Sequence, residues 1–192
     1  MTEDLTPGPC CGGGNCLILV AGDEEWSDYA VEVKLKPLAS VAKYRPDLPG
    51  LQYLTVNFWK NPGIVTLFDS DGNILSQGEP IHSGSPLLPV NWRGDGTEFA
   101  LLSGNVREGG MMDGHLRRVV MFPDDGHPDL AAHVINLTGD ARDEIVLWDQ
   151  EHVWIYTQDR PFGGRRLYAP IRNPPYNDSN YRANVSLPHW AN

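Results

Sequence analysis

Short apolar stretches separated by polar turns recur along this chain, and they have the length and character of β-strands. Residues 64–68, 117–122 and 152–157 are rich in aliphatic and aromatic side chains, which pack well on a pleated sheet. Asp71 and Gly72 follow the first stretch, and an Asp-Gly pair favours a tight hairpin because its turn needs positive φ. No long stretch has the spacing of an amphipathic helix. The pattern predicts an all-β protein.

A polar, glycine-containing loop comes directly before a strand-like run at three places. Residues 136–144 form the most informative copy, and residues 91–99 align with it without a gap, 45 residues earlier. A weaker third copy, residues 45–53, lies another 46 residues upstream. The matching pairs are Asn91 with Asn136, Gly94 with Gly139, Asp95 with Asp140, and Glu98 with Asp143.

A repeat of this length, made of short strands and turns, is typical of β-propeller blades. We expect three consecutive antiparallel sheets at about residues 40–85, 86–130 and 131–170. The runs 53–56, 99–102 and 145–148 should then occupy equivalent positions in successive sheets. The alternative is an ordinary β-sandwich with similar turns. We therefore expect an all-β fold, a partial propeller of about three blades preceded by a short separate β segment.

The loop at residues 136–144 is a candidate calcium site, because Ca²⁺ takes oxygen ligands from carboxylates, amides, hydroxyls and backbone carbonyls. Gly139 permits the loop to bend so that these oxygens converge. The expected ligands are the side chains of Asn136, Thr138, Asp140 and Glu144 and the carbonyl of Arg142. The copy at residues 91–99 should bind less well, since Arg93 replaces Thr138 and Phe99 replaces Glu144. The alternative is an acidic β-turn that holds no ion.

Charge and hydropathy narrow the classes of partner. The formal net charge of −10 argues against nucleic acid, whose binding proteins carry a basic face. No apolar run is long enough to span a membrane. The acidic residues 1–4 and the short apolar run 16–22 do not fit a secretory signal. Cys10, Cys11 and Cys16 are odd in number without a nearby histidine, which favours incidental thiols over a zinc site.

The first 39 residues differ in character from the rest of the chain. Residues 26–37 alternate strictly between apolar and polar side chains and end at a proline, which predicts a half-buried strand outside the repeat. We place a boundary near residue 39. Residues 1–39 then form a Gly/Cys-rich tail with one sandwich-like strand, and residues 40–192 form the repeat region.

Four stretches of the repeat region resemble the propeller of polysaccharide lyase family 11, the rhamnogalacturonan lyases. They are residues 41–51, 88–96, 139–146 and 170–183, and the resemblance covers roughly residues 41–188. The resemblance implies a Ca²⁺-dependent, secreted enzyme that cleaves acidic plant polysaccharide by β-elimination. It also implies an eight-bladed ring, whereas this chain has material for about three blades.

The implied reaction needs a base to remove a proton and Ca²⁺ to neutralise the neighbouring carboxylate. His82, His115 and His127 lie in loops and are weak candidates for the base; the alternative for each is an ordinary surface histidine. Arginines 165 and 166 form either a carboxylate-binding pair or a solvated turn. The resemblance assigns substrate binding to Arg172, Tyr176, Asn177, Asn180, Tyr181 and Arg182, whose alternative is a closing strand.

Two functions therefore remain open. The first is a Ca²⁺-dependent lyase acting on rhamnogalacturonan or a related pectic polysaccharide. The second is a non-catalytic carbohydrate-binding or structural propeller fragment. Because a ring of three blades cannot close, the outermost sheets should expose strand edges and apolar flanks, and we expect self-association.

Overall fold

The computed structural model describes residues 39–57, 64–79, 87–129, 132–172 and 184–191. These residues form three β-sheets and contain no helix, so the predicted all-β class is confirmed. Within them, no helix is long and apolar enough to cross a membrane. The predicted strand at 26–37, the cysteines and the boundary near residue 39 lie outside the described residues or at their edge.

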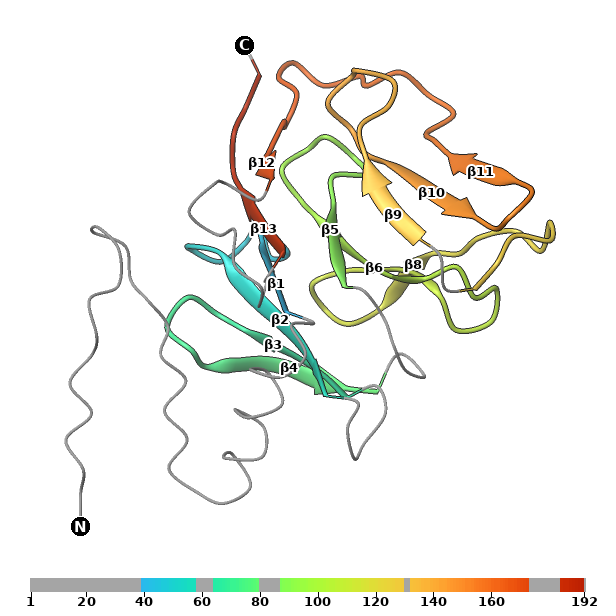
Figure 1. Ribbon diagram of the computed structural model, residues 1–192. Coiled ribbons are helices and arrows are strands. Elements are labelled where there is room, and N and C mark those ends of the chain that lie inside the picture. Colours follow the sequence, from blue (N-terminus) through green and yellow to red (C-terminus); the bar gives the residue numbers. More distant parts are fainter. Residues whose placement is uncertain (1–38, 58–63, 80–86, 130–131, 173–183, 192) are drawn as a thin grey trace, which may run out of the picture.

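The first sheet combines residues from both ends of the described chain, in the strand order β12-β13-β1-β2-β3-β4. Its strands are β1 (Ala39–Ala42), β2 (Gln52–Asn57), β3 (Ile64–Phe68), β4 (Ile74–Gly78), β12 (Ile171–Arg172) and β13 (Asn184–Leu187). Strands β1 to β4 form an antiparallel meander, whereas β13 runs parallel to β1. Figure 1 shows the dark red strand β13 near the blue strand β1, with β12 on its other side.

The second and third sheets are antiparallel meanders of consecutive strands. The second contains β5 (Leu88–Val90), β6 (Phe99–Ser103), β7 (Gly110–Met112) and β8 (Arg118–Val120). The third contains β9 (Ala132–Ile135), β10 (Glu144–Trp148) and β11 (Val153–Tyr156), with β10 in the middle. The sheets thus follow one another along the chain in the order and near the positions expected from the repeat (Figure 1).

The three strand-like runs that follow the loops form the second strand of each sheet, as expected, but their register differs from the expectation by one residue. Gln52, Phe99 and Glu144 each pair with the last residue of the preceding first strand. The equivalence expected for residues 53, 99 and 145 is therefore wrong. A shift of one residue places every side chain of a strand on the opposite face of its sheet. The observed register therefore determines which side chains pack against the neighbouring sheet.

Two apolar clusters lie on opposite faces of β6. Ala100 and Leu102 belong to a cluster that also contains Leu54 and Leu67 of the first sheet. On the other face, Phe99 and Leu101 belong to a second cluster, whose members in the third sheet include Ile145 and Leu147. Each fully buried leucine or isoleucine stabilises the fold by roughly 1.5–3 kcal/mol. The second sheet is therefore packed between the first and the third.

The turn between β3 and β4 matches the hairpin expected from the Asp-Gly pair. The Asp69 carboxylate accepts hydrogen bonds from the backbone N–H groups of Asp71 and Asn73, at 2.9 and 2.8 Å. Gly72 has a φ of 87°, a conformation that glycine adopts at little cost. The oxygens of Asp69 are thus used to close the turn.

Candidate functional site

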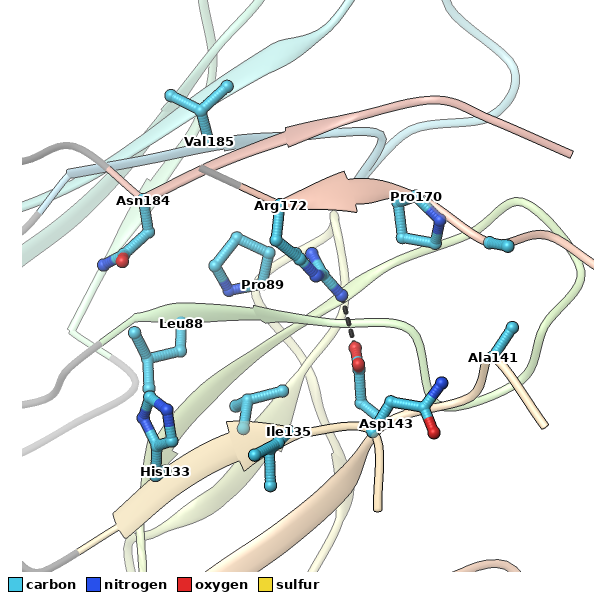
Figure 2. Close-up of a pocket in the computed structure, with 13 residues that line it drawn as sticks. Leu88, Pro89, His133, Ile135, Ala141, Asp143, Pro170, Arg172, Asn184 and Val185 are labelled. Carbon is cyan, nitrogen blue, oxygen red and sulfur yellow. Dashed lines mark hydrogen bonds and ion pairs between the residues drawn. The ribbon is translucent and has the colours of Figure 1, made fainter. Parts of the chain in front are cut away.

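A buried ionic group joins all three sheets at one point. Arg172, in β12, pairs with Glu98 through one guanidinium nitrogen and with Asp143 through the other. Glu98 comes directly before β6 and Asp143 directly before β10, so the arginine connects the C-terminal strands to the second and third sheets. Figure 2 shows the guanidinium of Arg172 pointing at the Asp143 carboxylate across the cavity described below.

Glu98 has every carboxylate oxygen occupied by donors from within the protein. Oε1 accepts from Ser186 Oγ at 2.6 Å and from Arg172 at 2.5 Å. Oε2 accepts from the Tyr168 hydroxyl at 3.1 Å and from the Lys43 backbone N–H at 3.3 Å. Because Glu98 is completely buried, these bonds replace the water that an ionised carboxylate loses on folding.

The electrostatics of this group favour a charged arginine. Burial by itself would lower the pKa of Arg172, but the carboxylates of Glu98 and Asp143 outweigh burial and raise it. Burial, followed by the negative charge of Glu98, raises the pKa of the neighbouring Tyr168 hydroxyl. Tyr168 therefore stays protonated and donates to Glu98, and the group is held together by charge-assisted bonds.

The two acidic residues make the same contact with the sheet that precedes them, which we call the inter-sheet contact. The Glu98 backbone N–H donates to Lys43 O at 3.0 Å, and the Glu98 carboxylate accepts from Lys43 N. Likewise, the Asp143 N–H donates to Asn91 O at 3.0 Å, and its carboxylate accepts from Asn91 N at 2.6 Å. Lys43 and Asn91 each follow the first strand of their sheet directly. One acid thus joins each sheet to the next through two bonds.

A cavity of about 380 Å³ lies beside Arg172. Its walls come from β5, β9, β12 and β13, and its polar lining includes His133, Asn136, Asp143, Arg172 and Asn184. In Figure 2, Pro89 and Leu88 lie on one wall, His133 and Ile135 on another, and Asn184 and Val185 on a third. The cavity has room for a small polar ligand, but its one carboxylate and its arginine already bind each other.

The predicted calcium loop is closed by hydrogen bonds from its own backbone. The completely buried Glu144 accepts from Leu137 N at 2.6 Å, Thr138 N at 3.3 Å and Thr138 Oγ1 at 2.9 Å. It also accepts from Thr157 Oγ1 at 3.3 Å. Asn136 Oδ1 accepts from the backbone of Gly139 at 2.7 Å. These oxygens hold the loop in shape, as in an Asx-type turn.

The other predicted carboxylate ligand faces a cation from the same loop. Asp140 binds the guanidinium of Arg142 through two side-chain nitrogens, and this bond lowers the pKa of Asp140. Within the described ranges, no three His, Cys, Asp or Glu side chains are grouped so that they could hold a metal ion. Asp140 and Glu144 thus belong to separate hydrogen-bond networks in this arrangement. Calcium binding here stays a prediction.

The candidate bases lie in different surroundings. His115 is in the exposed turn after β7, where its backbone N–H donates to Asp113 Oδ1 at 2.9 Å. His127 has a buried ring, with Nδ1 2.6 Å from Asp125 Oδ1 and Nε2 2.6 Å from the Gly104 carbonyl. A base role stays a prediction for both, and His82 lies outside the described residues.

The predicted substrate-binding residues are only partly described. Arg172 lines the cavity and is bound to two carboxylates, while residues 176, 177, 180, 181 and 182 lie outside the described ranges. Arginines 165 and 166 are exposed, and the guanidinium carbon of Arg166 lies 5.8 Å from the centre of the Trp190 ring. The structure thus places Arg172 and Asn136 in the lining of one cavity.

Sequence reasoning missed the residues that hold this site together. Glu98, Asp143, Tyr168 and Ser186 come from distant parts of the chain, and no local pattern places them in contact. One signal was present, because Glu98 and Asp143 occupy matching positions in the aligned loops. An acid that repeats directly before an apolar strand suggests a contact that repeats with the sheet.

No known family model, curated protein or solved structure matches this chain.

Proposed function

We propose that this chain is a non-catalytic, propeller-type structural module that works by packing its third sheet against a further β-sheet. The observation that carries this proposal is the outer face of the third sheet, the face turned away from the second sheet. This outer face is formed by His133, Ile135, Val146, Trp148, Val153 and Ile155, which share one side in the strand register.

The outer face occupies the position that is buried in the sheet before it. In the second sheet the corresponding residues form the apolar cluster against the third sheet. The corresponding pairs are Leu88 with His133, Val90 with Ile135, Phe99 with Glu144, Leu101 with Val146, and Met111 with Ile155. In the third sheet, by contrast, the exposed fraction is 65% for Val153 and 54% for Ile155. Exposed apolar residues gathered on one face mark a protein interface.

A structural role also agrees with how the acidic side chains are used. Glu98, Asp143 and Glu144 are buried and accept hydrogen bonds from protein donors. A general base needs a free position within hydrogen-bonding reach of a substrate proton. These three carboxylates instead hold sheets and loops in place, which favours the structural alternative over the lyase.

Self-association of the isolated chain tests the proposal. Without its further sheet, the outer face should pair with another copy, so the average mass in light scattering should rise with protein concentration. Ile155→Lys places a charge on the outer face, at a side chain with 54% exposure, and should keep the chain monomeric. Ile74→Lys is the matched control, because Ile74 is a strand isoleucine with 46% exposure in the first sheet. A chain that stays monomeric, or an Ile155→Lys variant that associates like wild type, would contradict the proposal.

A further inference from the structure

The inter-sheet contact has a third backbone position on which no acid is seated. We infer that the backbone N–H of Asn136 is the docking point for an Asp or Glu carboxylate on a further β-sheet of the same repeat, one that the described residues do not include. This inference rests on the proposed function and adds the chemistry by which the further sheet is recognised.

Asn136 and Asn91 are built alike. Each follows the first strand of its sheet directly, Asn91 after β5 and Asn136 after β9. Each closes the same local turn, since Asn91 Oδ1 accepts from Gly94 N at 3.2 Å and Asn136 Oδ1 from Gly139 N at 2.7 Å. The backbone N–H of Asn136 is therefore presented in the same manner as the one that Asp143 binds at Asn91.

The two asparagines differ in what lies against them. Asn91 is completely buried, its N–H is bound by Asp143, and its side-chain amide donates to the Ala141 and Tyr168 carbonyls at 2.7 Å each. Asn136 is exposed, and among the described residues no acceptor is bonded to its backbone N–H. It lies at the end of β9, beside Ile135 of the outer face. A polar anchor and an apolar face thus lie together, as they do where the third sheet packs on the second.

The three described sheets do not offer the matching acid to a second copy. Glu98 and Asp143 are already engaged in their own inter-sheet contacts. The corresponding position in the first sheet, directly before β2, is Leu51, which has no acceptor in its side chain. The matched occupant is therefore a further sheet, outside these three, with apolar residues on one face and Asp or Glu directly before its second strand.

The experiment links a further sheet to the chain and asks whether that sheet docks on the outer face. The full chain is extended at its C-terminus by a flexible glycine–serine linker and an added copy of residues 87–129, which carries Glu98 and the apolar face that meets a preceding sheet. The matched control has Glu98→Ala in the added copy only. We expect amide hydrogen exchange at Asn136 to slow by about tenfold or more with the acidic copy. The alanine copy should lack this protection. Trp148 should become less accessible to a fluorescence quencher.

Each result of this experiment either supports or overturns the inference. Trp148 shielded with unchanged exchange at Asn136 would mean docking without the carboxylate, which overturns the inference and leaves the structural role intact. Equal protection from the acidic and alanine copies would have the same meaning. An added sheet that changes neither residue overturns the docking itself. Protection of Asn136 in the unmodified chain, rising with its concentration, would show that a second copy is the occupant.

Discussion

At the scale of single residues, some side chains that the sequence suggests as exposed functional groups instead hold the fold together. His127, a histidine in a polar loop, is buried between Asp125 and the Gly104 carbonyl, and the Tyr156 hydroxyl donates to Asp125 at 2.9 Å. The Phe122 ring lies 4.9 Å from that of Tyr156. Loop position suggested an exposed ring because the neighbours of His127 along the chain are polar. Its burial depends on β11, about 30 residues later, which no local pattern reveals.

Two glycines with similar backbone conformations should respond differently to the same substitution. Gly110 and Gly126 have φ of 95° and 91°, so alanine is strained at both. A Cβ at Gly110 would lie 2.0 Å from the Val120 carbonyl oxygen, whereas nothing lies within 4 Å at Gly126. We expect Gly126→Ala to cost about 1 kcal/mol and Gly110→Ala about 4 kcal/mol or more. Urea unfolding of both variants checks this, and equal costs would refute it.

The carboxylate of Asp125 should contribute to stability in a pH-dependent way. Its hydrogen bond to His127, and then that from Tyr156, lowers the pKa of Asp125 in the folded state. The contribution is therefore complete above the ordinary aspartate pKa of about 3.9. It is lost as the pH falls through the lower folded value. Asp125→Asn should flatten the fall in unfolding midpoint below about pH 4, while Asp124→Asn, at an exposed neighbour, should leave it steep. Parallel acid profiles for the two variants would contradict this.

At the scale of elements, the strands could be predicted and their packing could not. The apolar runs and the Asp-Gly turn indicated β3 and β4 correctly, because periodicity and turn chemistry are local. The expected runs began one residue late at residues 53 and 145, because the first apolar residue was taken as the start of each strand, whereas Gln52 and Glu144 are polar and still belong to their strands. The ungapped alignment of residues 91–99 with 136–144 already pairs Phe99 with Glu144. The pairing of β13 with β1 was also missed, because the contact joins opposite ends of the described chain.

Glu98 should be the most sensitive of the acidic residues that join elements. Glu98→Ala removes one of the two carboxylate partners of Arg172, and it leaves the buried hydroxyls of Ser186 and Tyr168 without their acceptor. Breaking a buried ion pair in this way costs about 3–5 kcal/mol. The matched control, Glu151→Ala in the exposed turn before β11, should change the free energy of unfolding by less than about 0.5 kcal/mol. Similar midpoints in urea for these two variants would disprove the structural role of Glu98.

At the scale of the whole molecule, the described residues form three successive sheets with an apolar outer face at one end. We do not expect this arrangement to act as a lyase by itself. Elimination needs metal, arginine and base held in place by a rigid surround. Among the described residues, Arg172 is bound to Glu98 and Asp143, Asp140 is bound to Arg142, and His115 and His127 lie in separate turns.

We therefore expect no rise in ultraviolet absorbance when the chain is mixed with rhamnogalacturonan and Ca²⁺. Calorimetry of wild type and Asp140→Ala separately tests the calcium prediction, since Ca²⁺ would have to displace Arg142 from Asp140. Equal heats for both proteins would remove Asp140 from the ligands. Turnover of the polysaccharide by a cooperative monomer would contradict the structural proposal.

The pairing of β13 with β1 has a consequence for the order in which the sheets assemble during synthesis. Ser40 lies opposite Asn184 and Val41 opposite Val185, so the first of the three described sheets is completed by a strand that is synthesised after the other two sheets. Contacts between such distant segments close slowly, because a long loop must be ordered first. During synthesis the second and third sheets can assemble while β1 still lacks its parallel neighbour. A chain cut short before residue 184 would keep β1 unpaired on that side, so its first sheet should be less stable than with β13 present.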